Sequence, residues 1–305
     1  TLDATGATFT ANEGTSAGAW RGIYVSYQNS SDAGTVNLDN CIVEYAESIY
    51  IRNGSLILDN GTMISDFSGY GLDIYSQGSV NISNTTIQNA SYPVYFRSGS
   101  GNGSWNVGEN VSLTGNSTDY VYIDFRDVNS LFSLDDPGIP YYYDSELRVT
   151  SSGTLTLNAG VSLLGNTNAH INVYGKLKAN GTETDSVTFG HTPDASYWEG
   201  LNFRDASIDS ACILSYAKFT GATYSYYNNR NYEMERAAVE IFHSAPVFHH
   251  TTFTGNRYNL VVRGLSQPEF NNCSFEPSAN ENKQAMNLNM EMNAEASAAA
   301  WAALG

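Results

Sequence analysis

Six segments of the chain repeat one pattern of apolar residues. They begin at Asn37, Ile57, Asn81, Ile213, Val247 and Glu269. One column of their alignment contains Leu38, Leu58, Ile82, Leu214, Phe248 and Phe270, and a second contains Val43, Met63, Ile87, Phe219, Phe253 and Phe275. Repeats of this length are typical of a solenoid, in which each unit buries its apolar side only against its neighbours. The repeats therefore constrain the architecture more than the chain length does.

A second family of short strands follows these segments. Its paired apolar residues are Ile49/Ile51, Leu72/Ile74, Val94/Phe96, Val121/Ile123, Ile171/Val173, Val239/Ile241 and Leu260/Val262. Alternation of this kind places one face of a strand inward. The units are too short for crossover helices, so successive turns are expected to coil directly into parallel sheets. A sandwich of short strands is the alternative, but the recurrence of whole two-strand units favours an all-β parallel β-helix.

Two tandem modules are predicted, because AWRGIYV from Ala19 is similar to YWEGLNF from Tyr197. We place module 1, truncated on its N-terminal side, at residues 1–132, a junction at 133–146 and module 2 at 147–278. Pro137 and Pro140 interrupt the strand pattern at the junction. It is either a hinge or a bulged loop, and the quick return of alternation favours the loop. Residues 279–305 are rich in Ala and Met, which suits a short helical cap or a non-native tail.

Asparagine recurs at one corner of the repeat, at Asn40, Asn60, Asn84, Asn110 and Asn272, with Tyr216 and His250 at the same place in two copies. Stacked asparagine side chains can form a hydrogen-bonded ladder. The alternative is that they serve only as turn residues.

The charge of the chain excludes some classes of partner. Lys and Arg number 14 against 31 Asp and Glu, which gives a net charge of −17. A surface of this kind repels phosphate backbones, so no nucleic-acid binding is expected. Anionic glycans are disfavoured too, except at local arginines. No membrane insertion is expected, since no apolar run approaches the roughly 18 residues of a span. Cys41, Cys212 and Cys273 are expected to be small buried residues without a disulfide.

The chain resembles a family of known proteins over about residues 139–275, and more loosely over 18–126. The run GTLTLNAGVSLLGN from Gly153, then INVYGKLKANGTETDSVTF, WEGLNF and ILSYAKFTG, is similar to phrases of the right-handed parallel β-helix repeat proteins of bacterial cell surfaces, which share the pectin lyase-like fold. The resemblance implies a right-handed coil. Its implication for function is open, because that fold serves lyases, adhesins and passenger domains.

Catalysis in such proteins uses outward carboxylates with a calcium ion or a basic residue. The candidate carboxylates here are Asp73, Asp124, Asp127, Asp205, Asp209 and Glu240. Asp135 and Asp136 are interpreted as a pair of turn residues. The histidines His191, His243, His249 and His250 are interpreted as structural. These residues do not form a dense cluster in adjacent coils with a matching basic residue. We therefore predict no catalytic residue and no obligatory cofactor, although the resemblance admits calcium. A polysaccharide lyase or glycoside hydrolase is the alternative function, with Asp73 and Asp124 or Asp205 and Asp209 as the carboxylate pair.

An outward stripe of aromatic and arginine side chains is the main functional signal. It contains Tyr50, Arg52, Tyr75, Tyr95, Arg97, Tyr122 and Tyr174. Flat rings beside planar guanidinium groups suit stacking on sugars, although aromatic residues also favour strands for structural reasons. We expect a non-enzymatic, secreted or cell-surface structural or adhesin module. Its expected partners are a glycan or another surface protein, together with further domains of the same chain.

Overall fold

The chain is an all-β parallel β-solenoid, as the repeats predict. A computed structural model describes residues 1–26, 33–75, 77–97, 103–205, 207, 211–223, 227–228, 233–234, 237–276 and 286–289. Over these ranges no helix has the length and apolar character to cross a membrane. The structure divides into two compact units, Thr1–Phe125 with Phe132–Tyr141 (unit 1) and Arg126–Leu131 with Tyr142–Gly305 (unit 2).

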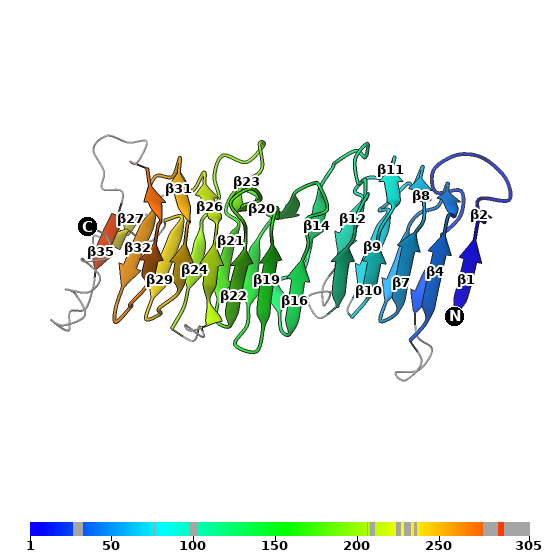
Figure 1. Cartoon of the computed structure of the whole chain (residues 1–305). Coiled ribbons are helices and arrows are strands. Elements are labelled where there is room, and N and C mark those ends of the chain that lie inside the picture. The colour runs from blue at the N-terminus through cyan, green and yellow to red at the C-terminus, as the bar shows by residue number, and fades with distance from the viewer. Residues whose placement is uncertain are drawn as a thin grey trace. The chain divides into compact units, whose positions relative to one another are not determined.

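Unit 1 consists of coils whose strands form three parallel sheets. The first sheet has the order β1 (Leu2–Thr5), β4 (Thr35–Asp39), β7 (Ser55–Asp59), β10 (Ser79–Ile82) and β13 (Ser104–Val107). The second contains β2 (Thr8–Phe9), β5 (Ile42–Glu44), β8 (Thr62–Ser65) and β11 (Thr85–Gln88). The third contains β3 (Tyr24–Ser26), β6 (Ile49–Arg52), β9 (Leu72–Tyr75), β12 (Val94–Phe96) and β14 (Val121–Ile123). Figure 1 shows such neighbours side by side, for example β4, β7 and β10.

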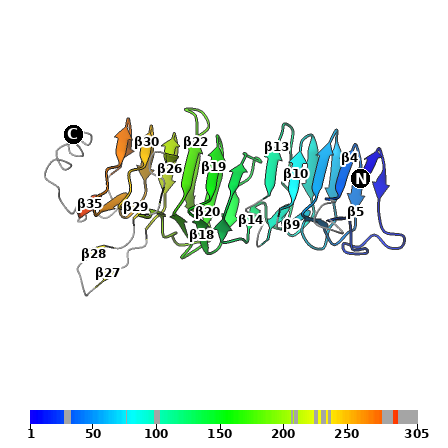
Figure 2. The same ribbon diagram turned by 90° about the horizontal axis from the view of Figure 1, so that it is seen from below.

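Unit 2 repeats the three-sheet arrangement. One sheet has the order β15 (Asp127–Val128), β18 (Glu146–Val149), β21 (His170–Val173), β24 (Leu201–Phe203), β29 (Val239–Phe242), β32 (Leu260–Arg263) and β35 (Met286–Asn289). Another contains β19 (Thr154–Asn158), β22 (Lys176–Asn180), β25 (Ile213–Ser215), β30 (Val247–His249) and β33 (Glu269–Asn271). The third contains β20 (Ser162–Gly165), β23 (Val187–His191), β26 (Ala217–Thr220), β31 (Thr252–Thr254) and β34 (Ser274–Phe275). A separate antiparallel pair, β27 (Tyr227–Asn228) with β28 (Glu233–Met234), stands away from these sheets in Figure 2.

Two further strands lie where the division between the units falls, β16 (Leu131–Leu134) and β17 (Tyr141–Tyr143). They occupy part of the predicted junction, 133–146, so strand structure flanks the segment that contains Pro137 and Pro140. The helical cap predicted for 279–305 lies mostly outside the described residues, and its described part, 286–289, is strand β35.

The first predicted column forms the core as expected. Leu38 pairs with Leu58 and Leu58 with Ile82 in unit 1, and Phe248 pairs with both Leu214 and Phe270 in unit 2. All six side chains are less than a tenth exposed. Burial of this kind contributes about 25 cal/mol per Å² of apolar surface, so the stacked columns are the main stabilising feature of the fold.

The second column is wrong at one position. Ile64, not Met63, pairs with Val43 and Ile87, and Ile64 is fully buried. Gly61 lengthens this turn by one residue and has a φ of 90°. A shift of one residue moves every following side chain to the opposite face of a strand, so the alignment placed the outward Met63 in the core.

The asparagine corner is a left-handed backbone turn. Asn40, Asn60, Asn84, Asn110 and Asn272, and also Tyr216 and His250, have φ between 44° and 55°. Asparagine tolerates this region better than most residues. The predicted ladder is real only in part: Asn110 Nδ2 donates to Asn84 Oδ1, whereas Asn60 and Asn84 donate to Asp39 and Asp59 of neighbouring coils. Tyr216 and His250 stack at 4.5 Å between ring centroids.

Cysteine or threonine often follows this corner and points inward. The hydroxyl or thiol donates to the carbonyl oxygen two residues earlier, as in Thr85 to Ser83, Thr251 to His249 and Cys41 to Asp39. All three cysteines are free thiols, as predicted. Cys41 and Cys212 are buried as expected, whereas Cys273 is only partly buried. At Cys41 the thiol therefore takes the place that threonine fills in other coils.

Candidate functional site

One outward row of tyrosines runs across the third sheet of unit 1. Tyr24 pairs with Tyr50, Tyr50 with Asp73, Asp73 with Tyr95, and Tyr95 with Tyr122. The parallel register places these side chains on the same face at the spacing of adjacent strands, about 4.8 Å. Together with Tyr70, Tyr75 and Tyr92, these tyrosines form the surface that we call the tyrosine face.

An ion pair anchors the centre of the tyrosine face. Arg97 Nε and Nη2 lie 2.7 and 3.0 Å from the two carboxylate oxygens of Asp73. The Asp73 side chain is 1% exposed and that of Arg97 32%. A bidentate arrangement fixes the plane of the guanidinium group as well as its position. Asp73 points outward from the sheet, yet the side chains above it cover it almost completely.

The rings pack on this anchor and on one another. The Arg97 guanidinium carbon lies 5.5, 5.0 and 5.0 Å from the ring centroids of Tyr70, Tyr75 and Tyr95. Tyr70 stacks on Tyr95 at 4.1 Å, and Tyr24 stacks on Tyr50 at 4.4 Å. Cation–π contacts with a partly buried arginine stabilise such a cluster. The tyrosine face is therefore a preorganised surface and not a set of independent side chains.

The cluster shifts the titration of its members. Burial raises the pKa of Asp73, and the Arg97 guanidinium offsets part of that effect. The Asp73 carboxylate in turn raises the pKa of Arg97. Burial also raises the pKa of Tyr50 and of Tyr95, and hydrogen bonds with Glu47 and Asp124 respectively add to this. The phenols therefore stay protonated at neutral pH and present polar hydroxyl groups.

Six of the seven residues predicted as an outward stripe come from the third sheet of unit 1. Tyr50, Tyr75, Tyr95, Tyr122 and Arg97 take part in the tyrosine face, and Arg52 is exposed and pairs with Tyr75 in register. Tyr95 is only 8% exposed, so it supports the surface from within. Tyr174 lies elsewhere, directly after β21 in unit 2. The predicted stripe is thus divided between two different sheets.

Sequence reasoning missed three members of the tyrosine face. Tyr24 is 57% exposed and belongs to a short strand that the repeats did not reveal. Tyr70 and Tyr92 both lie two residues before the first inward residue of a strand, Leu72 and Val94. Strand alternation would place a residue at this position in the core, but the backbone turns before the strand begins, so both tyrosines lie on the outer surface. The sequence signal that could have identified them is that both tyrosines lie two residues before a strand.

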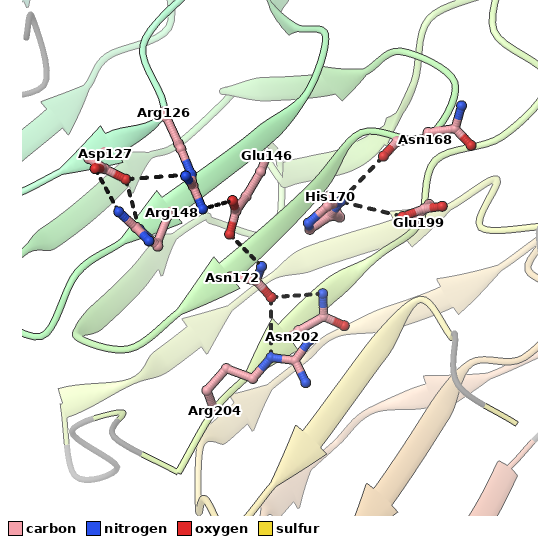
Figure 3. A network of polar contacts seen from close by, with 10 residues as sticks. All are labelled: Arg126, Asp127, Glu146, Arg148, Asn168, His170, Asn172, Glu199, Asn202 and Arg204. Atoms are coloured by element: carbon pink, nitrogen blue, oxygen red, sulfur yellow. Dashed lines mark hydrogen bonds and ion pairs between the residues drawn. The ribbon is translucent and has the colours of Figure 1, made fainter. Parts of the chain in front are cut away.

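A second polar surface covers the sheet of unit 2 that begins with β15, and Figure 3 shows it. Arg148 binds Asp127 through two hydrogen bonds of 2.8 and 2.7 Å, and Arg126 pairs with Glu146. Asn172 Nδ2 donates to Glu146 at 2.7 Å, while its Oδ1 accepts from Asn202 and Arg204, both at 3.2 Å.

Two acidic groups of this surface are shielded from solvent to different degrees: Glu146 is half-buried and Glu199 is buried. Burial works to raise the pKa of Glu146, but the Asn172 hydrogen bond and Arg126 outweigh it, so the pKa is lowered. Glu199, 8% exposed, lies 3.4 Å from His170 Nδ1. The contacts from Arg148 to Arg204 form one connected chain across neighbouring strands, and the His170–Glu199 pair lies beside it (Figure 3). Together we call them the unit 2 polar network.

The carboxylates considered for catalysis are not brought together as a pair. Asp73 is bound to Arg97, and Asp124 lies two strands further along the sheet. Asp205 is exposed, and Asp209 lies outside the described residues. Asp136 accepts from Gly138 N within its own turn, and Asp135 accepts from Val107 N. In the part of the chain that the structure describes, no cluster of three or more His, Cys, Asp or Glu side chains is arranged to hold a metal ion.

Comparison with known proteins does not assign the chain to a family. No protein-family model, no curated protein and no solved structure matches the chain significantly. The functional argument therefore depends on the two surfaces themselves.

Proposed function

We propose that the chain is a non-enzymatic β-solenoid module of a secreted or cell-surface protein, and that the tyrosine face binds an uncharged glycan. A relation to the parallel β-helix proteins of bacterial surfaces, with the pectin lyase-like fold, is part of this proposal. Its support is the similarity of the sequence phrases and the parallel solenoid fold. Secretion is supported by the polar, lysine-poor composition.

The preorganisation of the tyrosine face is the observation that carries the proposal. Three tyrosines, Tyr70, Tyr75 and Tyr95, pack on one anchored arginine, Arg97. Tyr92 and Tyr122 pack on this group, and Tyr24 is 57% exposed on the Tyr50 ring. Rings held in place before binding lose little conformational entropy when a sugar stacks on them. Protonated phenols also offer donors and acceptors to sugar hydroxyl groups.

Binding is favoured over cleavage because the carboxylate at the centre of the tyrosine face, Asp73, is already paired with Arg97. Asp73 is 1% exposed and its two oxygens accept from Arg97. A glycosidase needs two carboxyl groups about 5 to 9.5 Å apart that reach opposite sides of one glycosidic bond. Asp73 meets that requirement poorly, since the rings of the tyrosine face lie between it and any ligand.

The test is a glycan array probed with the native chain and with the triple variant Tyr24→Ala, Tyr50→Ala, Tyr122→Ala. We expect the native chain to bind uncharged glycans, and the variant to lose at least about tenfold in affinity, because stacked rings contribute about 1.4 kcal/mol or more in total. Tyr95 is left intact, since its burial gives it a role in stability.

Tyr216→Asn is the matched control. It removes one half-buried aromatic ring from unit 2 and places there the residue that other corners use. Native-like binding by Tyr216→Asn, with loss in the triple variant, supports the proposal. Equal binding by all three proteins, or cleavage of a bound glycan, contradicts it.

A further inference from the structure

A row of alternating aromatic and cationic side chains lies beside the unit 2 polar network. Phe242 pairs in register with Arg263, and continuation of the adjoining registers aligns Tyr174 with Arg204 and Arg204 with Phe242. The order across four neighbouring strands is therefore Tyr174, Arg204, Phe242, Arg263. We call this the alternating row. Phe242 is 38% exposed, and the side chains of Arg204 and Arg263 are 31% and 17% exposed.

Both arginines of the alternating row are held from below by the same acidic residue. Arg204 Nη1 lies 3.9 Å and Arg263 Nη1 lies 3.6 Å from the carboxylate oxygens of Glu240, which is 5% exposed. Arg204 Nε also donates to Asn172 Oδ1 at 3.2 Å. Two guanidinium groups thus share the carboxylate of Glu240, which fixes them at two positions of the row.

The spacing of the row defines the ligand it suits. Adjacent parallel strands are about 4.8 Å apart, which is close to the length of one sugar unit in an extended glycan. The two arginines are separated by one aromatic position, so acidic groups are favoured on every second sugar. Tyr174 and Phe242 offer rings to the sugars between. We propose that the alternating row binds a linear glycan that carries an acidic group on alternate sugars.

This binding site shares no residue with the tyrosine face, whose residues belong to unit 1 and whose one arginine, Arg97, is paired with Asp73. The proposal therefore stands or falls separately from the proposed function. The probes are hyaluronan, which has a carboxylate on every second sugar, and polygalacturonate, which has one on every sugar. Affinity is measured by calorimetry for the native chain and again for the triple tyrosine variant, so that any contribution from unit 1 is removed.

We expect hyaluronan to bind more tightly than polygalacturonate, and to bind equally well when the tyrosine face is altered. Arg204→Gln with Arg263→Gln should weaken hyaluronan binding about tenfold or more, the effect of losing charge-assisted hydrogen bonds. Lys178→Gln with Lys218→Gln is the matched control, because it removes the same charge from exposed positions on the other two sheets of unit 2.

A second variant keeps the test decisive if loss of the arginines unfolds the protein. Tyr174→Ala with Phe242→Ala leaves the Glu240 ion pairs intact and should also weaken hyaluronan binding. The proposal is overturned if a folded chain does not bind hyaluronan, or if polygalacturonate binds as tightly. It is also overturned if the lysine control loses as much affinity as the arginine variant, because the effect then depends on total charge alone.

Discussion

At the scale of single residues, Asp73 is the buried acidic residue that anchors the tyrosine face. Its carboxylate is buried and makes two hydrogen bonds with Arg97. Asp73→Asn keeps the shape but removes the charge, so Arg97 loses its charged partner. We expect the free energy of unfolding to fall by about 1–3 kcal/mol, less than for a fully buried pair because Arg97 is partly exposed. Denaturant unfolding monitored by circular dichroism measures this change.

A double-mutant cycle separates the Asp73–Arg97 pair from its surroundings. Arg97→Gln alone leaves a buried carboxylate without its partner, whereas the double variant Asp73→Asn, Arg97→Gln leaves two neutral amides. We expect a coupling energy above about 1 kcal/mol, as for residues that share one interaction. Additive effects of the two substitutions would show that the pair does not hold the tyrosine face together.

At the scale of the element, the corner with an inward threonine or cysteine is the repeated device of the solenoid. Thr85 is 1% exposed, and its hydroxyl donates to Ser83 O at 2.7 Å. Thr85→Val removes the donor and should lower the free energy of unfolding by about 1 kcal/mol. Thr85→Cys is the control, because Cys41 fills the same place with a thiol that donates to Asp39 O. Thermal unfolding should rank Cys close to the native residue and Val below it, and the reverse order would contradict a role for the donor.

The elements also show how far sequence reasoning reaches. The inward pairs, from Ile49/Ile51 to Leu260/Val262, could be predicted because alternation records which face is buried. Met63 was misplaced because Gly61 adds one turn residue and because Met63 and Ile64 are both apolar, so the sequence pattern fits either residue as the inward one. Burial of Tyr95 and Asp73 beneath neighbouring rings could not be foreseen, since strand alternation specifies direction and not what covers an outward side chain. Tyr174 was part of the predicted outward stripe, but its alignment with Arg204, Phe242 and Arg263 was visible only once the registers were known.

At the scale of the whole molecule, stability is expected to be local, because each coil of a solenoid packs only on its neighbours. In unit 2, Phe219 stacks on Phe189 at 4.7 Å and on Phe253 at 5.1 Å. Phe219→Ala leaves a cavity in the middle of this stack and should destabilise the coil by about 3–5 kcal/mol.

Amide hydrogen exchange measures how far that damage spreads. Protection should fall most in β26 and in its neighbours β23 and β31, and least in β15 and β18 of the same unit. Lys218→Ala, an exposed substitution on the same strand, should leave exchange unchanged. Equal loss of protection throughout unit 2 would mean that its coils unfold as one block. A graded loss would show instead that the contacts between adjacent coils, which the apolar columns of the sequence encode, determine the stability of each part of the solenoid.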